Sequence, residues 1–87
     1  MNVTWTEAAL ELLADYYVTI PLGEQREISG TVERINAELA VRGRELGESR
    51  ERDDRRIWFK DRLMVLFSVL STGILVTSVV FLRGKKR

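Results

Sequence analysis

Arginine, lysine, carboxylate and tyrosine side chains are the groups in this sequence that could transfer a proton in catalysis, because its 87 residues contain neither histidine nor cysteine. Their absence excludes thiol and imidazole nucleophiles, imidazole general bases, disulfides and zinc sites built on those residues. Asp53 and Asp54 form an acidic pair without further ligands, so we expect no metal site, and we expect no cofactor. Chemistry that depends on concentrated positive charge stays open to the chain.

The positive charge is concentrated in the second half of the chain. Residues 1–41 contain two basic and seven acidic residues, a net charge of −5, whereas residues 42–87 contain twelve basic and six acidic residues, a net charge of +6. Such a division favours an anionic partner, such as RNA, DNA or acidic lipid, for the second half. A solvated surface with a basic tail explains the same composition, and charge alone does not separate these two interpretations.

Two groups of basic residues have the side chains that phosphate chemistry needs. One group follows the last apolar segment and consists of Arg83, Lys85 and Lys86. The other flanks a short alternating segment and consists of Arg55, Arg56, Lys60 and Arg62. Phosphoryl transfer requires positive charge at the phosphate oxygens together with a proton donor and acceptor. For each of these residues the alternative role is a solvated charge, which on an edge strand discourages pairing between molecules.

The first half of the chain predicts a strand followed by a helical hairpin. Alternating apolar residues predict a strand over residues 2–5. Thr6 is an N-cap residue type, and the spacing of the apolar residues that follow predicts a helix over residues 6–19. Pro21 interrupts this pattern, and a second apolar stripe predicts another helix over residues 24–41. Two amphipathic helices joined by a short turn form an antiparallel hairpin.

The second half allows two interpretations. Residues 63–82 carry no charge and are long enough for a single transmembrane helix with a basic flank. Against a span, Ser71-Thr72-Gly73 stands at its middle, and eight of its twenty residues are β-branched, which favours strands. Residues 56–60 alternate with period two, with Ile57 and Phe59 on one side and Trp58 with the charges on the other. The strand interpretation predicts a charged loop over residues 47–56. It predicts three strands after the loop, over about 55–60, 63–70 and 74–83.

In this order the sequence resembles the RelE/ParE family of type II toxin–antitoxin toxins. Residues 3–17 are similar to the family's opening strand and first helix, with Trp-Thr-x-x-Ala at residues 5–9. Further similarity lies in residues 32–39, 47–50, 56–59 and 65–69, which resemble the second helix, a Gly-x-Ser-Arg stretch and two strands. The resemblance covers nearly the whole chain as one domain, 1–87. It implies an α+β fold with a short N-terminal strand, a two-helix antiparallel hairpin and a three-stranded antiparallel meander.

The resemblance implies a toxin that blocks growth and is neutralised by a cognate antitoxin. RelE-like members are mRNA interferases that cleave messages on the ribosome, whereas ParE-like members inhibit DNA gyrase, and the sequence does not separate these targets. The resemblance implies catalytic charge at Arg83, Lys85 and Lys86, and RNA contacts at the residues that flank the alternating segment. Met64 occupies a position where the nucleases often carry arginine, and no tyrosine follows the last predicted strand. These departures favour an incomplete nuclease site.

Partner and location follow from the same interpretation. We expect an apolar antitoxin-binding surface formed by Tyr16, Tyr17, Ile20 and Trp58; for the tyrosines the alternative is core packing, and Trp58 is also suited to stacking on a base. The acidic N-terminal region has no signal-peptide pattern, so we expect a cytoplasmic protein without a membrane partner. The competing hypothesis is a small membrane protein with one span over 63–82 and a cytosolic helical interaction module.

Overall fold

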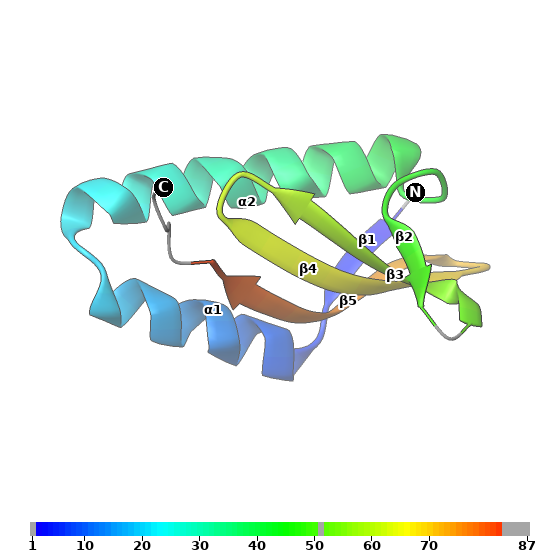
Figure 1. Ribbon diagram of the computed structural model, residues 1–87, viewed down its shortest axis with the longest axis horizontal. Helices are drawn as coiled ribbons and strands as arrows, with labels where there is room; N and C mark the ends of the chain where they lie inside the picture. The colour runs from blue at the N-terminus through cyan, green and yellow to red at the C-terminus, as the bar shows by residue number, and fades with distance from the viewer. Residues whose placement is uncertain (1, 51, 83–87) are drawn as a thin grey trace.

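The computed structural model describes residues 2–50 and 52–82, which form a five-stranded sheet and two helices (Figure 1). The elements in chain order are β1 (Asn2–Trp5), α1 (Glu7–Thr19), α2 (Leu22–Arg42), β2 (Glu48–Arg50), β3 (Arg52–Lys60), β4 (Leu63–Leu70) and β5 (Gly73–Phe81). The predicted α+β class is confirmed, as is the order of an N-terminal strand, a helical hairpin and an antiparallel meander.

The ends of both helices follow from local chemistry. Thr6 caps α1, because its hydroxyl oxygen accepts a hydrogen bond from the backbone N–H of Ala9 at 3.1 Å. Pro21 takes the N-cap position of α2 in an extended conformation, so α2 begins at Leu22, two residues before the predicted start. Gly43 is the C-cap residue of α2. It lies close against β5, so that a Cβ at this position would lie 2.7 Å from the side chain of Ile74.

The sheet joins the two ends of the described chain. Its strand order is β1-β5-β4-β3-β2, with β3, β4 and β5 forming the antiparallel meander. Two-residue turns at 61–62 and 71–72 connect these three strands. β1 pairs in parallel with β5, so that Val3 lies opposite Ile74. The N-terminal strand therefore completes the sheet beside the last strand.

The prediction of a charged loop over residues 47–56 is wrong. β2 occupies residues 48–50 and pairs with β3, which begins at residue 52 rather than 55. An edge strand is held by backbone hydrogen bonds on one side, so it does not need the apolar side chains that a buried strand needs. Composition therefore concealed both β2 and the first part of β3.

Residues 63–82 do not form one helix. They form β4 and β5, joined by the turn at Ser71 and Thr72, as the strand interpretation predicts. The β5 strand ends at Phe81, whereas the predicted strand extends to residue 83. Arg83 itself lies outside the described residues. Across residues 2–50 and 52–82, no helix has the length and apolar character needed to cross a membrane.

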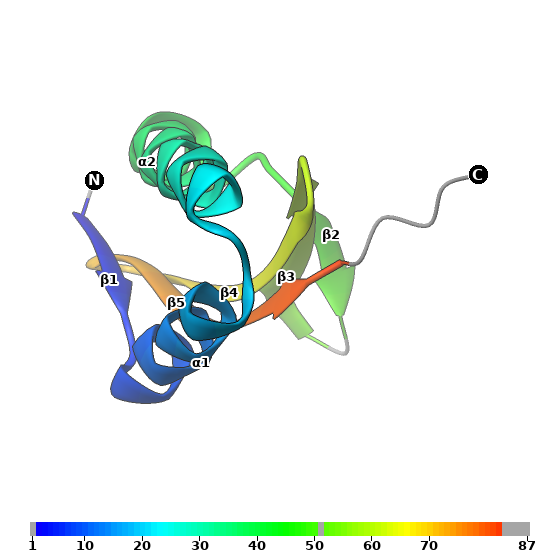
Figure 2. The same ribbon diagram turned by 90° about the vertical axis from the view of Figure 1, so that its left-hand side faces the viewer.

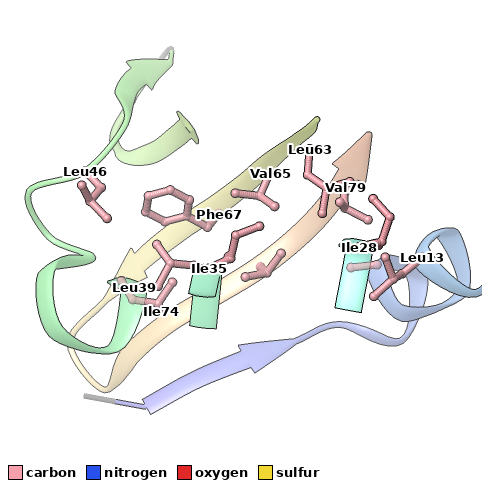
Figure 3. Close-up of a cluster of buried hydrophobic side chains, with 12 residues drawn as sticks. Leu13, Ile28, Ile35, Leu39, Leu46, Leu63, Val65, Phe67, Ile74 and Val79 are labelled. Atoms are coloured by element: carbon pink, nitrogen blue, oxygen red, sulfur yellow. The ribbon is translucent and has the colours of Figure 1, made fainter. Parts of the chain in front are cut away.

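Both helices lie on the same side of the twisted sheet (Figure 2). α2 covers the sheet, and α1 continues from β1 along the second half of β5, where Tyr16 contacts Phe81. The core fills the space between these layers (Figure 3), with the largest fully buried side chains being Phe67, Ile35, Leu39, Leu63, Ile74, Val65, Val76 and Val79. Each such side chain stabilises the fold by about 1.5–3 kcal/mol through its removal from water.

Candidate functional site

The face of the sheet that points away from the helices is the first candidate site. On β4, Leu63, Val65 and Phe67 are buried beneath the helices, so the alternate residues Met64 and Leu66 point to the other face. Cross-strand pairing adds residues from the neighbouring strands to this face, and together they are Ile57, Phe59, Met64, Leu66, Leu75 and Val80. We name these six residues the open face.

The open face is apolar and accessible. Phe59 is 57% exposed, and the other five side chains are half-buried. Within the described part of the chain, no helix or strand packs over this face (Figure 2). Ser68 and Ser78 lie among these apolar residues, because they pair with Leu75 and Leu66. An exposed surface with this apolar content is typical of a binding surface.

A hollow of about 300 Å³ lies beside the open face, where β3, β4 and β5 run side by side. Its lining combines apolar and polar groups and consists of Arg55, Arg56, Ile57, Leu66, Phe67, Ser68 and Thr77. A β-bulge shapes the hollow, because the pairing of β4 with β5 shifts by one residue between Leu66 and Phe67 and leaves Thr77 extra. The Thr77 hydroxyl donates to the backbone oxygen of Leu66 at 3.3 Å. Bulges often re-aim side chains beside functional sites.

Of the four basic residues expected to contact RNA, Arg55 belongs to the open side of the sheet. It is exposed at the hollow and lies opposite Ser68 of β4. Arg56 also lines the hollow, but its Nη1 donates to backbone oxygens of the segment after α2, those of Arg44 at 2.8 Å and Leu46 at 3.2 Å. Arg56 thus links the segment after α2 to β3 through two hydrogen bonds.

Lys60 and Arg62 contact α2 rather than the hollow. The Lys60 Nζ lies 2.8 Å from Glu38 Oε2, and it also lies 6.0 Å from the centre of the Trp58 ring. Arg62 Nη1 lies 3.7 Å from Glu24 Oε1. The structure therefore does not bring the four basic residues together on one surface.

The residues expected to bind an antitoxin are half-buried and pack against the core from the helix side. The Tyr16 hydroxyl donates to the backbone oxygen of Val79 at 3.4 Å, and the Tyr17 hydroxyl lies 2.5 Å from the Ser29 hydroxyl. Ile20 and Trp58 also pack against the core. Trp58 faces Val65 rather than solvent, and the open-face residues Ile57 and Phe59 are the ones that point away from the helices.

Among the described residues, Asp61 is the titratable group whose pKa clearly departs from its usual value. The Arg34 guanidinium donates to its carboxylate at 2.9 Å, and the Thr31 hydroxyl donates at 3.1 Å. These hydrogen bonds, Arg34 first, hold the pKa of Asp61 below its usual value. The side chain accordingly stays ionised at neutral pH and links α2 to the turn between β3 and β4.

Sequence reasoning missed the open face as a unit. Its signal is spread over three strands, and the continuous apolar run of β4 hides which residues alternate between the two faces. The proposed catalytic residues Arg83, Lys85 and Lys86 lie outside the described residues. Among the residues that are described, no three His, Cys, Asp or Glu side chains gather in a way that would hold a metal ion.

Comparisons with known proteins do not assign this chain to a family. No protein-family model matches the chain, and no curated protein matches it.

Proposed function

We propose that this chain is a growth-inhibiting toxin of the RelE/ParE type, neutralised by a cognate antitoxin, and that it acts by binding DNA gyrase through the open face. The observation that carries the choice of target is the apolar character of that face in the described part of the chain. Apolar surface removed from water contributes about 25 cal/mol per Å², which suits a protein partner. Nucleic acid would be bound mainly through phosphate contacts.

Inhibition of an enzyme by binding needs no chemical step from this chain. Met64 lies at the centre of the open face, between Phe59 of β3 and Val80 of β5. Leu66 lies between Ile57 of β3 and Ser78 of β5. Arg55 at the hollow supplies one positive charge at the edge, which favours an acidic residue of the partner beside an apolar anchor. In this proposal the cytoplasm is the place of action.

Ribosome-dependent mRNA cleavage is the second candidate, and the observation that favours it is the basic segment after β5. In that reaction the 2′-oxygen of one nucleotide forms a bond to the adjacent phosphorus while the bond to the 5′-oxygen breaks. Arg83, Lys85 and Lys86 would neutralise the phosphate, and the proton would move from the attacking to the leaving oxygen. Arg55 would contact the RNA backbone.

The deciding experiment measures incorporation of labelled thymidine and labelled methionine after the chain is induced in a bacterial host. We expect thymidine incorporation to fall first, and Phe59→Lys to relieve the effect because it places a charge on the open face. Val18→Lys is the matched control, since Val18 is 82% exposed on α1, away from the open face. Circular dichroism checks that both variants fold.

Other outcomes decide between the alternatives. If methionine incorporation falls first and Arg83→Ala with Lys85→Ala restores it, the nuclease mechanism replaces gyrase inhibition. If neither label changes although folded protein accumulates, the toxin assignment is wrong.

The antitoxin is tested separately. Its contacts with Tyr16, Tyr17, Ile20 and Trp58 stay a prediction, and each of these side chains is half-buried rather than fully covered. The protein encoded by the neighbouring reading frame should co-purify with this chain. Tyr17→Ala should weaken that association, whereas Val41→Ala, a change at a residue that is 77% exposed near the end of α2, should leave it unchanged.

A further inference from the structure

A second hollow lies between α2 and the turn that joins β3 to β4. It has a volume of about 360 Å³ and is lined by Arg26, Glu27, Ile28, Gly30, Thr31, Arg34, Asp61 and Arg62. Three of these eight residues are arginines, two from α2 and one from the turn, so two different elements contribute arginines to the hollow. We name this site the arginine hollow.

Arg34 contacts two neighbouring side chains in the arginine hollow. Its Nη2 donates to Asp61 at 2.9 Å and to the hydroxyl of Thr31 at 3.1 Å. Thr31 is only 4% exposed and itself donates to Asp61 at 3.1 Å. Within the described chain these contacts use Nη2 alone, which leaves the other N–H donors of the guanidinium for a ligand.

Arg26 and Arg62 are held less tightly. Arg62 lies 3.7 Å from Glu24, longer than a hydrogen bond. Arg26 is exposed, and within residues 2–50 and 52–82 it makes no hydrogen bond or ion pair. Because Glu24, Glu27 and Asp61 balance the three arginines, the surrounding field is weak. Binding at this site must therefore come from directed N–H donors rather than from net charge.

Gly30 is the second, independent feature of the arginine hollow. It lies within α2, where glycine weakens a helix relative to alanine. Packing does not require glycine here, because an added Cβ would meet only Arg34 Nη1, at an ordinary contact distance of 3.5 Å. A glycine without a packing reason at the wall of a hollow permits close approach of a ligand to the backbone.

From this arrangement we propose that the arginine hollow binds a phosphate group. Arg26 and Arg62 donate to its oxygens, Arg34 presents its remaining donors, and Gly30 admits the group close to α2. The planar guanidinium matches phosphate geometry with paired hydrogen bonds. The phosphate belongs either to an RNA backbone or to a free phosphorylated molecule. This inference does not depend on the function proposed above.

The test is a titration of the ¹⁵N-labelled protein with inorganic phosphate, followed by the amide signals of Arg26, Gly30 and Arg62. We expect these signals to shift together, and the combined change Arg26→Ala and Arg62→Ala to weaken binding by at least about tenfold, the usual effect of losing a charge-assisted hydrogen bond. Arg42→Ala is the matched control, because it removes the same charge from the same helix about 18 Å beyond Gly30. It should leave the affinity unchanged.

Two substitutions at Gly30 distinguish an effect on phosphate binding from an effect on the stability of the fold. Gly30→Ala should raise the melting temperature by a few degrees, because it removes a helix-weakening residue without a clash. Gly30→Leu should fill the hollow and abolish the phosphate-induced shifts while the protein stays folded. If Gly30→Leu binds phosphate as well as the wild-type chain, the proposal is overturned.

The source of the phosphate is resolved by competition. A short single-stranded oligouridylate that shifts the same amides and displaces inorganic phosphate assigns the site to RNA. Displacement by a nucleoside triphosphate but not by the RNA assigns it to a free phosphorylated molecule. Shifts that are scattered over the whole surface, and are equal in the Arg26→Ala, Arg62→Ala variant, would contradict a built site.

Discussion

At the scale of single residues, Asp61 joins two constraints. It occupies the first position of the turn after β3 with a positive φ of 55°, a conformation that aspartate tolerates better than most residues. Its carboxylate also accepts hydrogen bonds from Arg34 and Thr31 of α2. Backbone conformation and side-chain contacts therefore select the same residue at this turn.

The lowered pKa of Asp61 predicts how stability depends on pH. A carboxyl group whose folded pKa lies below its value in the unfolded chain contributes stability above that unfolded value, and this contribution is lost as the pH falls through the folded pKa. Asp61→Asn keeps the tolerance for positive φ but removes the charge. We expect its urea midpoint to lie below that of the wild-type chain at pH 7, and the difference to shrink as the pH falls below 4. A difference that stays constant between pH 7 and pH 2 would contradict the ionic contribution.

Gly43 and Gly23 predict opposite effects of one substitution. Gly43→Ala should destabilise the protein by about 1–3 kcal/mol, because the new Cβ would lie 2.5 Å from the Leu39 backbone oxygen and 2.7 Å from the Ile74 side chain. Gly23→Ala meets nothing within 4 Å and should be neutral or stabilise by up to about 1 kcal/mol. Urea unfolding of the two variants under the same conditions measures both effects. Equal effects would show that the contact with β5 does not determine the choice of glycine.

The sequence identified several charged residues of interest but not what they contact. The family resemblance implies RNA contacts for Lys60 and Arg62, which lie beside a turn. Their contacts are Glu38 and Glu24, which lie far earlier in the chain on α2. No local pattern reveals such a pairing, because it depends on how α2 crosses the sheet.

At the scale of elements, Arg56 fastens the segment after α2 to the middle of the meander. Arg56→Ala should lower the free energy of unfolding by about 1.5–3 kcal/mol, the range for hydrogen bonds from a charged donor, since it removes the contacts with the Arg44 and Leu46 backbone oxygens. Arg55→Ala is the neighbouring comparison and should cost less, because Arg55 is exposed on the other face. Chemical unfolding monitored by tryptophan fluorescence measures both changes. A larger loss for Arg55→Ala would contradict the fastening role of Arg56.

Element boundaries were predictable where capping or turn chemistry is local. Thr6, Pro21 and Gly43 mark the helix ends, and the turn at Ser71 and Thr72 divides the long apolar run. The edge strand β2 was not predictable, because its pairing partner, rather than its own composition, makes it a strand. The same reason explains why β3 begins earlier than its apolar residues suggest.

At the scale of the whole molecule, the sheet has one face beneath the helices and one open face. Phe67 and Phe59 lie on adjacent strands but on opposite faces, with 1% and 57% of their surfaces exposed. Phe67→Ala should cost about 3–5 kcal/mol in free energy of unfolding, because it leaves a cavity in the core.

Phe59→Ala should cost far less and should reduce the binding of a dye that reports exposed apolar surface. Urea unfolding and dye fluorescence test this pair of variants. Similar losses of stability would mean that the open face is covered in solution.

The parallel pairing of β1 with β5 also has a consequence for how the protein is made. During synthesis β1 emerges well before its sheet partner, which lies in residues 73–76, more than sixty positions later. Until those residues emerge, β1 has no neighbour in the sheet, and α1 lacks the strand that covers its buried side. The helical hairpin can form early, but the five-stranded sheet is complete only after β5 has been synthesised. A nascent chain of this protein therefore stays incomplete, and its open face unformed, until translation has passed β5.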